Sequence, residues 1–581
     1  MADHRALDRV QHARPRRHPR RRPLPARPLG KEVAVGETLT PDPRRGQEGG
    51  LVRSTALMSI GTALSRLTGF LRVAAMAFAL GVAETRLADA YNVPNNVPNI
   101  IYELVLGGIL SSVFVPVFVE RLTAKDEKDP WHVARAVMTV TLLVLGVVMV
   151  IGILAAPAII RLYTFRVEGP EREAAQAVAT LFLRYFMPQI VLYGIGAVAT
   201  GILNAHRRFA APMFAPILNN LVVIAAFLIF AAMPAGPGTP APGTITLAQK
   251  LVLALGTTGG VAAMTFALWP TLRRLGFRFR WTLDLRHPSV RKLLRLSGWV
   301  VGYVVVNQIG LLIVIVLAGG VQGGYTAYQA AFIFFQLPHA IFAVSIMTAL
   351  LPSLSELWVR EDRAGFRRIL ARGIRASAFV VVPAAAGYLV LARPIVRLLL
   401  EHGVAGAAST DLVSGVLVFF AIGLFPFSAF QLFLRAFYAM QDTRTPLLVN
   451  VGAVTLNTAV NFALFPVLGV RGLALGHAVA YAFAALVAGI ILRGRLGGLE
   501  GKSVAAGLLK VAVAAAMTAA AAWSVAMVVA QGLGTEGFAR QALQVGGGIV
   551  AGLVVFVVAA LVLRMEEFDL VRRSILRRGR R

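Results

Sequence analysis

Long apolar stretches recur along the chain from residue 54 to residue 563, separated by short polar breaks. Cutting the sequence at these breaks yields about fourteen spans of ~20 or more residues, each long enough to cross a hydrocarbon core of ~30 Å as a helix. The pattern therefore predicts an all-α polytopic membrane protein. The predicted spans are 54–81, 93–119, 133–157, 177–203, 211–233, 248–269, 294–319, 325–353, 368–391, 411–435, 445–467, 471–492, 503–530 and 541–563.

Basic residues alternate between the loops. One set of loops holds roughly 23 Lys and Arg residues and the other set roughly 8, and the richer set is expected to stay in the cytoplasm. We therefore expect a multi-pass protein of the cytoplasmic membrane with both termini cytoplasmic. The formal net charge of +30 lies mostly in the tails and in these loops. That placement favours contact with membrane lipids over binding of nucleic acid.

Two loops of the chain are similar to each other. The segment GILNAHRRFAAP ending at Pro212 resembles RAFYAMQDTRTP ending at Pro446, and each joins the fourth and fifth spans of a six-span group. Repeats of one orientation predict two parallel lobes, although an accidental similarity of loop chemistry is the alternative. The expected parts are a disordered basic cytoplasmic tail (1–50), an N-lobe (51–270), a C-lobe (271–495), two added spans (496–564) and a second basic cytoplasmic tail (565–581).

Composition and loop length narrow the function classes. The chain is 57% hydrophobic, 15% charged and free of cysteine, which removes thiol chemistry and disulfides. The gaps between spans are too short for a soluble catalytic domain, and the sequence has no phosphate-binding glycine loop and no metal-spaced histidine pair. The sequence thus predicts a transporter rather than an enzyme, with no cofactor and no metal. His339 and His477 stand singly in apolar spans, which favours packing roles for both.

The first span carries two arginines. Arg66 lies near its middle and Arg72 two turns later, where a guanidinium in hydrocarbon costs at least ~2.5–3.5 kcal/mol. At 100° per residue Arg66 shares a stripe with Gly69 and with hydroxyl side chains, and Arg72 lies at the edge of that stripe. We expect this face to look into a cavity rather than at lipid. The hydroxyl residues of the stripe are Thr55, Ser59 and Thr62.

The second span carries a row of amides on one helical face, ending in a carboxylate. Two prolines interrupt its hydrogen-bond ladder, and the freed carbonyls are tolerated only where protein or water receives them. We expect this face to line the same cavity, with Glu103 as counter-ion of an arginine. The alternative is that Glu103 and the arginine form an ion pair that only holds the two helices together. The row is Asn92, Asn95, Asn96, Asn99 and Glu103, and the prolines are Pro94 and Pro98.

Further polar side chains give weaker signals. Amides recur every seven residues into the eighth span and form a second stripe in the eleventh, and packing is the favoured interpretation of both sets. Asp442 and Arg444 lie in the predicted cytoplasmic loop before Pro446, where gating and plain helix termination are equally open. The two amide sets are Gln322, Gln329 and Gln336, and Asn450, Asn457 and Asn461.

Several motifs, taken together, resemble those of a known family. They occur in order over about residues 54–500 and are similar to the MurJ (MviN) family of lipid II flippases in the MOP exporter superfamily, and YELVLGG at 102–108 resembles the actinobacterial branch of that family. The motifs are SRLTGFLR at 65–72, DAY at 89–91, VPN at 97–99, FVPV at 114–117, ALLPSLS at 349–355 and FYAMQDTRTP at 437–446.

The resemblance implies a fold and an activity. It implies MATE-like lobes of six helices, plus two C-terminal helices, that move lipid II from the inner to the outer leaflet by alternating access. The partners are the undecaprenyl-diphosphate-linked precursor, membrane lipids and cell-wall synthesis or division proteins. Arginine suits such a diphosphate because its planar fork binds phosphate oxygens in pairs. The expected substrate-binding residues are Arg66, Arg72, Asp89, Asn95, Asn99, Glu103 and Gln336.

The sequence also departs from the family pattern. Many relatives have an aspartate where Val73 stands, and an arginine with a nearby acid where Ile333 and Gln336 stand. Anion binding should therefore fall more heavily on Arg66 and Arg72. The driving ion stays open. The alternatives are a multidrug exporter or a capsule-oligosaccharide-lipid exporter of the same fold, and a non-transporting scaffold for cell-wall synthesis.

Overall fold

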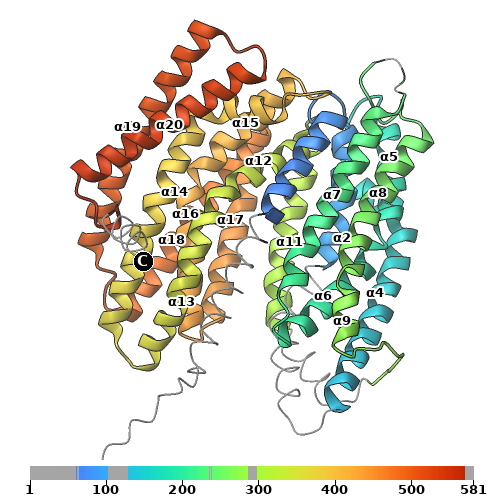
Figure 1. Cartoon of the computed structure of the whole chain (residues 1–581), viewed down its shortest axis with the longest axis horizontal. Coiled ribbons are helices and arrows are strands. Elements are labelled where there is room, and N and C mark those ends of the chain that lie inside the picture. The colour runs from blue at the N-terminus through green and yellow to red at the C-terminus, as the bar shows by residue number, and fades with distance from the viewer. Residues whose placement is uncertain are drawn as a thin grey trace, which may run out of the picture. The chain divides into compact units, whose positions relative to one another are not determined.

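The computed structural model describes residues 61, 64–102, 128–234, 236, 238–284 and 298–568. Within these residues every regular element is a helix (Figure 1). The first helix covers residues 64–80. The others are α2 (Leu87–Tyr102), α4 (Lys128–Tyr163), α5 (Arg172–Phe186), α6 (Gln189–Ala205), α7 (Ala210–Ala232), α8 (Leu247–Phe266), α9 (Trp269–Arg274), α11 (Gly298–Ala318), α12 (Gly324–Pro338), the π-helix η3 (His339–Ala343), α13 (Val344–Val359), α14 (Arg363–Leu400), α15 (Ala407–Ile422), α16 (Leu424–Ala439), α17 (Arg444–Leu468), α18 (Val470–Leu496), α19 (Gly501–Leu533) and α20 (Phe538–Val562).

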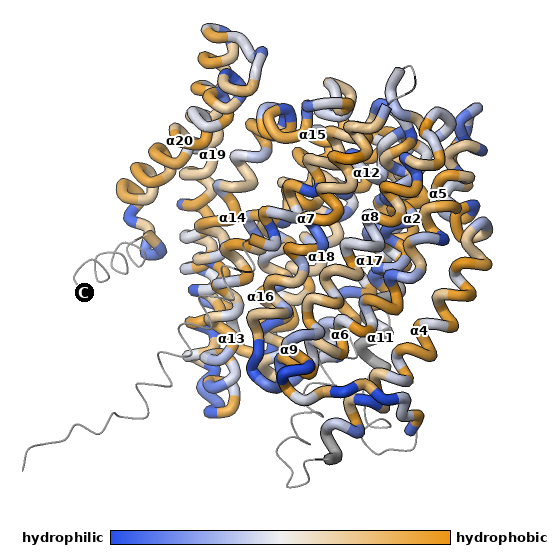
Figure 2. Tube along the Cα trace, turned by 45° about the vertical axis from the view of Figure 1, so that its right-hand side comes forward, coloured by the Kyte–Doolittle hydropathy of each residue, from blue (hydrophilic) through white to orange (hydrophobic). Residues whose placement is uncertain are grey.

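The helices have the length and composition of membrane spans. Among the described residues 10 helices are long and apolar enough to cross a bilayer, or 11 if α15 and α16, bent by 50°, count as one span. Hydrophobic residues occupy the long middle parts of the helices, and hydrophilic residues gather toward their ends (Figure 2). The all-α polytopic class is therefore confirmed. The figure of fourteen spans stays a prediction, because α11 is a shorter apolar helix and the first two predicted spans extend beyond the described residues.

The helices pack in two groups and a pair. Helices α2 and α4 to α9 contact mainly one another, as do α11 to α18, while α19 and α20 pack on each other and on α14 (Figure 1). We call the first group, together with the first helix, the N-lobe helices and the second group the C-lobe helices. The grouping agrees with two lobes and an added pair, but the boundaries at 51–270, 271–495 and 496–564 stay predictions. The tails 1–50 and 569–581 lie outside the described residues.

The two similar loops fold into the same turn. Arg207, between α6 and α7, has a φ of 57°, and Gln441, between α16 and α17, has a φ of 59°. Each residue lies five positions before the proline that ends its segment. Left-handed backbone is uncommon outside glycine, so equal placement in both loops supports a true repeat over an accidental similarity. The matching hydrogen bonds run from Arg208 N to Leu203 O (2.8 Å) and from Asp442 N to Phe437 O (2.9 Å).

Prolines in the helices that shape the interface are not followed by loops. Helix α2 continues through Pro94 and Pro98. Helix α12 ends at Pro338 and passes directly into the π-helix η3 and then α13, so these three elements follow one another without a loop. A π-helical turn of this kind is rare and is frequent at functional sites. It lies directly after the part of α12 that faces the first helix.

Candidate functional site between the two helix groups

The first helix presents two guanidinium groups. Arg66 is exposed and Arg72 is half-buried. Within the described part of the chain neither forms a hydrogen bond or an ion pair. Arg66 lies within electrostatic range of His339 in η3, whereas Arg72 lies within range of the Tyr91 hydroxyl in α2. One cation therefore faces the C-lobe helices and the other faces the N-lobe helices.

Other side chains of the first helix pack against neighbouring helices. Asn220 of α7 donates its amide N–H groups to Thr68 Oγ1 (3.0 Å) and to the Ser65 carbonyl (3.3 Å). On the other side of the helix, the Phe70 ring meets Phe334 of α12 edge-on, with 5.1 Å between ring centroids. The row that contains Arg66 and Phe70 thus faces the C-lobe helices. The hydroxyl residues predicted for the stripe, Thr55, Ser59 and Thr62, lie outside the described residues.

The amide side chains of α2 contact different parts of the molecule. Asn95 is half-buried, and its carbonyl accepts a hydrogen bond from Asn99 Nδ2 at 3.1 Å. Asn96 lines a cavity among the C-lobe helices, and Asn92 bonds to α12. Glu103, the predicted counter-ion, lies outside the described residues. Asn92 and Asn96 therefore meet the C-lobe helices, while Asn95 and Asn99 bond within α2, and a cavity that this row shares with Arg66 stays a prediction.

Hydrogen bonds between described residues of the two lobes gather at one end of the bundle. They run from residues 78–92 to residues 319–326 and 404–409, and we call this set of contacts the seam. One of them joins backbone to backbone, from Val404 N to Phe78 O at 2.9 Å. The seam combines the loop between the first helix and α2 with the starts of α12 and α15. It holds the two lobes together at that end.

Glu84 is the centre of the seam. Its Oε2 accepts from Ser409 Oγ (2.5 Å) and from Val82 N (2.9 Å), and its Oε1 accepts from Gly406 N (2.8 Å). Ser409 Oγ also accepts from the N–H groups of Val82 and Ala83 at 3.0 Å each. Partial burial raises the pKa of Glu84, but these hydrogen bonds outweigh burial and hold the pKa below its ordinary value of 4.5. The carboxylate of one lobe therefore caps the start of α15 in the other lobe.

Asp89 makes a second carboxylate contact at the seam. Its Oδ1 accepts from Thr326 N (2.9 Å) and from Thr326 Oγ1 (2.7 Å), within the first turn of α12. Asn92 Nδ2 donates to Thr326 Oγ1 as well, at 3.1 Å. Asp89 is buried, and its Oδ2 has no partner among the described residues. The structure thus places this predicted substrate-binding residue against Thr326, at the N-terminus of α12.

The seam also requires close approach of two backbones. Gly323, with a φ of +70°, lies so close to residues 82–83 that a Cβ would come within 2.1 Å of the Val82 carbonyl oxygen. Arg86 donates to the Gly319 carbonyl at 3.2 Å, and Gln322 Nε2 donates to the Ala83 carbonyl at 2.9 Å. Gln322 is therefore a packing amide, as expected. No signal within the 82–86 segment alone could have located its partners in the C-lobe, because they lie more than 230 residues away.

The Asp442 loop lies at the ends of C-lobe helices. Asp442 Oδ1 accepts from the backbone N–H groups of Arg444 (2.9 Å) and Thr445 (3.0 Å), and Oδ2 accepts from Arg495 of α18 at 2.6 Å. Burial raises its pKa, but the hydrogen bonds from Thr445 and Arg495 and the Arg495 charge together outweigh burial and lower the pKa to about 2. This arrangement accounts for helix initiation, and the gating role of Asp442 and Arg444 stays a prediction.

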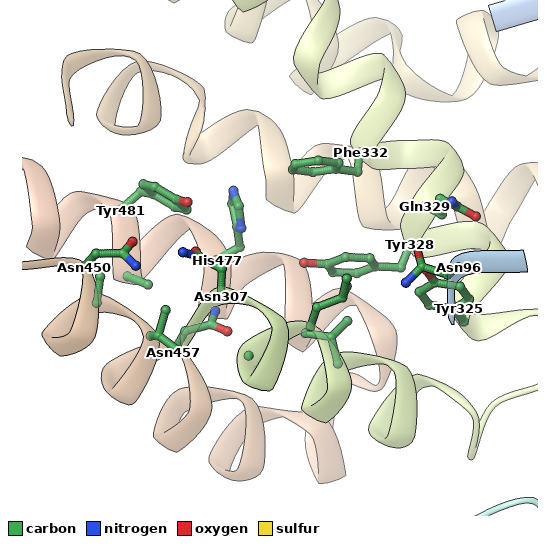
Figure 3. A pocket seen from close by; sticks show the side chains of 16 residues that line it. Asn96, Asn307, Tyr325, Tyr328, Gln329, Phe332, Asn450, Asn457, His477 and Tyr481 are labelled. Atoms are coloured by element: carbon green, nitrogen blue, oxygen red, sulfur yellow. The ribbon is translucent and has the colours of Figure 1, made fainter. Parts of the chain in front are cut away.

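Sequence reasoning missed a cavity among the C-lobe helices. It has a volume of about 360 Å³ and lies between α11, α12, α17 and α18, with Asn96 of α2 in its wall. Asn450 and Asn457, expected to serve packing, line this cavity, as do Gln329, His477 and Tyr481 (Figure 3). Asn461 donates to Asn457 Oδ1 at 3.0 Å and is a packing amide. The recurring amides were the available signal, but only the folded helices turn them toward one space.

Two other predicted positions lie on the C-lobe side. His339 bonds to Ser428 Oγ through Nδ1 at 2.9 Å, so its packing role is confirmed. Gln336 is half-buried and lies one turn before His339 on α12. Among the described residues no three His, Cys, Asp or Glu side chains gather in a way that could hold a metal ion.

Comparisons with solved structures identify the fold. A lipid II flippase MurJ in an inward closed conformation matches with a TM-score of 0.71 at 21% identity, covering 89% of this chain and 100% of that chain. A multidrug resistance MATE family transporter of the MOP superfamily, in an inward-facing conformation, matches with a TM-score of 0.61 at 16% identity, covering 76% of this chain and 100% of that chain. The MurJ and MATE-like fold is therefore confirmed.

Sequence comparisons extend the similarity along the chain. A probable lipid II flippase MurJ from Rhizobium meliloti is 28% identical over 531 residues, which covers 91% of this chain and 96% of the relative. A lipid II flippase MurJ from Burkholderia cenocepacia is 29% identical over 452 residues, covering 77% of this chain and 84% of the relative. The family model described as lipid II flippase MurJ matches residues 76–542. Because that match spans most of the sequence, this multi-pass membrane protein belongs to the lipid II flippase MurJ family.

Proposed function

We propose that this chain is a transporter that moves lipid II from the inner to the outer leaflet of the cytoplasmic membrane by alternating access, and that Arg66 and Arg72 bind the diphosphate of the lipid. Membership of the family supports the substrate. The observation that carries the site is the pair of guanidinium groups on the first helix, which have no hydrogen-bond or ion-pair partner among the described residues. Intramembrane charges of this kind are usually functional.

The chemistry of a diphosphate fits these two side chains. A guanidinium donates several N–H groups in a planar fork, and charge-assisted hydrogen bonds gain strength where water is excluded. Arg66 is exposed on the face toward α12, so it makes the first contact, and the half-buried Arg72 lies two turns further along the helix. The isoprenoid tail remains in the membrane while the headgroup passes between the lobes.

The seam defines one end of the transport cycle. By the distribution of Lys and Arg between loops, the seam lies on the extracytoplasmic side, so the described state is closed on that side. Release of the headgroup to the outer leaflet then requires the seam to break. We assign Asp89 to this closure rather than to the substrate, because both of its hydrogen bonds are to Thr326. Asn95, Asn99 and Gln336 remain candidate substrate contacts.

Complementation tests the proposal directly. In cells depleted of their own flippase, wild-type protein should restore growth and precursor flipping, while Arg66→Ala and Arg72→Ala should each fail at equal protein level. Arg540→Ala, on the exposed surface of α20, is the matched control and should grow as wild type. Normal growth and flipping with both variants would show that the assigned mechanism is wrong.

The same assay separates the rival functions. A cell-wall scaffold acting through its basic tails would lose activity on deletion of residues 1–50 and 565–581 but tolerate both arginine variants. A drug exporter would protect vesicles or cells from cationic compounds and leave precursor flipping unchanged. Binding of cell-wall synthesis or division proteins through the tails stays a prediction that the deletions also test.

A further inference from the structure

The cavity among the C-lobe helices has an unusual lining for an intramembrane space. The described side chains that line it include several amides and hydroxyls but no Asp, Glu, Lys or Arg. Its volume of about 360 Å³ falls in the range of small-molecule sites, which is ~300–1,000 Å³, and is large compared with the ~30 Å³ of one water molecule. An uncharged cavity of this size, lined by both polar and apolar side chains, matches an uncharged ligand that has polar and apolar faces.

Several polar atoms in the cavity wall lack partners. Asn96 Nδ2, Asn450 Nδ2 and His477 Nε2 are buried and form no hydrogen bond to described residues. A buried polar group without a partner costs about 1–3 kcal/mol. The two amide N–H groups favour a ligand with oxygen acceptors, and the imidazole nitrogen, which donates or accepts according to its tautomer, suits a hydroxyl group. A cation is a poor match, because the unpaired atoms are nitrogens and hard cations bind oxygens.

Aromatic and small aliphatic residues form the rest of the wall. Tyr328 and Tyr481 direct their hydroxyl groups toward the space around His477, and Phe332 presents its ring from the α12 side (Figure 3). The Phe332 ring lies edge-on to the His477 ring at 5.6 Å between centroids, so the wall is held by ring contacts rather than by ion pairs. Flat apolar faces beside amides and hydroxyls are the combination that suits a carbohydrate ring, which has apolar C–H faces and hydroxyl edges.

The cavity lies beside the proposed diphosphate site. Helix α12 separates them: Phe332 lines the cavity, while Phe334 packs against Phe70, one turn after Arg66. Asn96 of α2 belongs to the cavity wall and comes from the lobe that carries the arginines. Neighbouring packed helices are ~8–10 Å apart, so one headgroup can reach both places.

We propose that this cavity binds the uncharged carbohydrate of the lipid-linked headgroup while Arg66 and Arg72 hold the diphosphate. The inference rests on the proposed function, which it extends by dividing the headgroup between two sites of different chemistry. The N-lobe supplies the charge, and the C-lobe supplies neutral hydrogen bonding. The carbohydrate site should therefore discriminate between lipids that share the same diphosphate.

Two lipids test this division. Binding of the purified full chain is measured with undecaprenyl diphosphate and with the same lipid bearing an N-acetylated disaccharide. The wild type should prefer the disaccharide lipid by about tenfold or more, since each net hydrogen bond contributes roughly 0.5–1.5 kcal/mol. The double variant Tyr328→Phe/Tyr481→Phe and, separately, Asn450→Leu should reduce this preference to about twofold or less. Neither should change the affinity for undecaprenyl diphosphate.

Matched variants control for folding and position. Val451→Leu lies next to Asn450 on α17 but is 38% exposed on the outer face of the helix, so it should keep the wild-type preference. Tyr438→Phe, an exposed tyrosine of α16, controls for loss of a hydroxyl. Unchanged affinity for undecaprenyl diphosphate shows that a cavity variant is folded.

The outcomes separate this inference from the proposed function. An equal preference in wild type and cavity variants overturns the carbohydrate site, and so does a wild type that shows no preference. A cavity variant that weakens both lipids equally also overturns it, because the cavity then supports the fold only. Arg66→Ala and Arg72→Ala should weaken both lipids. If they weaken neither, the proposed diphosphate site fails, whatever the cavity variants do.

Discussion

The seam and the first helix both carry charged side chains at the interface of the lobes, but they differ in partners. At the seam, Glu84 and Asp89 accept hydrogen bonds from backbone N–H groups and hydroxyls of the opposite lobe. On the first helix, Arg66 and Arg72 have no such partner among the described residues. The contrast teaches that a charge whose partners are protein groups stabilises one arrangement of the lobes, whereas an unpartnered charge is available to a ligand.

The most severe way to break the seam is at Gly323. Gly323→Val should abolish closure, because its positive φ disfavours a branched residue and its Cβ would collide with the Val82 carbonyl. The chain has no cysteine, so a pair introduced at Ala83 and Gln322 reports closure by disulfide formation. Cross-linking and complementation should both fall to background. Gly169→Ala is the control, since its φ is +96° but nothing lies within 4 Å of its Cβ position. Normal cross-linking with Gly323→Val would contradict the close approach.

A pair of variants should separate the two uses of charge. Glu84→Gln keeps the shape but removes the charge, and a hydrogen bond to a charged group contributes about 1.5–3 kcal/mol, so closure measured by cross-linking should weaken about tenfold or more. Its affinity for undecaprenyl diphosphate should stay near that of the wild type. Arg66→Ala should show the opposite pattern, with cross-linking intact and lipid affinity reduced about tenfold or more. Arg66→Lys should fall between, because it keeps the charge but loses the fork. The same defect in both assays for both variants would remove the distinction.

Acidification should act on the seam and spare the first helix. The pKa of Glu84 is lowered in the closed state relative to its ordinary value of 4.5. Closure is therefore fully favoured above that ordinary value and weakens as the pH falls through the lowered pKa. The closed fraction, measured from pH 7 downward by the distance between spin labels at residues 83 and 322, should decline only below pH 4.5, and Glu84→Gln should flatten this profile. A decline at a higher pH that persists in Glu84→Gln would assign the effect to another group.

The smallest effect is expected far from both regions, at the Asp442 loop. Asp442→Asn should lower the free energy of unfolding by about 1 kcal/mol, since it weakens a helix-initiating contact and a partly exposed ion pair with Arg495. The pKa of about 2 means that this contribution is lost only as the pH falls from the ordinary carboxyl value of 3.8 toward 2. Thermal melting in detergent measures it. Flipping should stay normal, and a transport defect with unchanged stability would favour gating instead.

Sequence patterns located most of the fold and one half of the proposed site. Apolar run length locates spans because a helix must satisfy its own backbone in lipid, and that requirement is local. The free-energy cost of placing Arg66 and Arg72 in an apolar span also depends only on that span. It therefore indicated a function before any tertiary contact was known. The repeat was visible in two loops, in which an alanine and a proline stand at equal offsets from the left-handed residues Arg207 and Gln441.

Other residues could not be assigned in this way. Asp89 was predicted as a substrate contact, and no local pattern indicated that Thr326, 237 positions away, donates to it. Asn450 and Asn457 looked like packing amides, and only the arrangement of α11, α12, α17 and α18 turns them into a shared cavity wall. Glu84 gave no signal at all, because its partners belong to the loop before α15.

The sequence by itself determined that the chain is a helical membrane protein with an expensive pair of cations on its first helix. Length, hydropathy and the desolvation cost of charge act within one segment and are written in that segment's residues. Only the tertiary structure decided which polar groups form hydrogen bonds within the protein and which stay available to a ligand. A polar group that already has a hydrogen-bond partner is not available to a ligand. The partners here come from helices hundreds of residues apart in the sequence. Only the packed lobes therefore distinguish the seam from the proposed ligand sites.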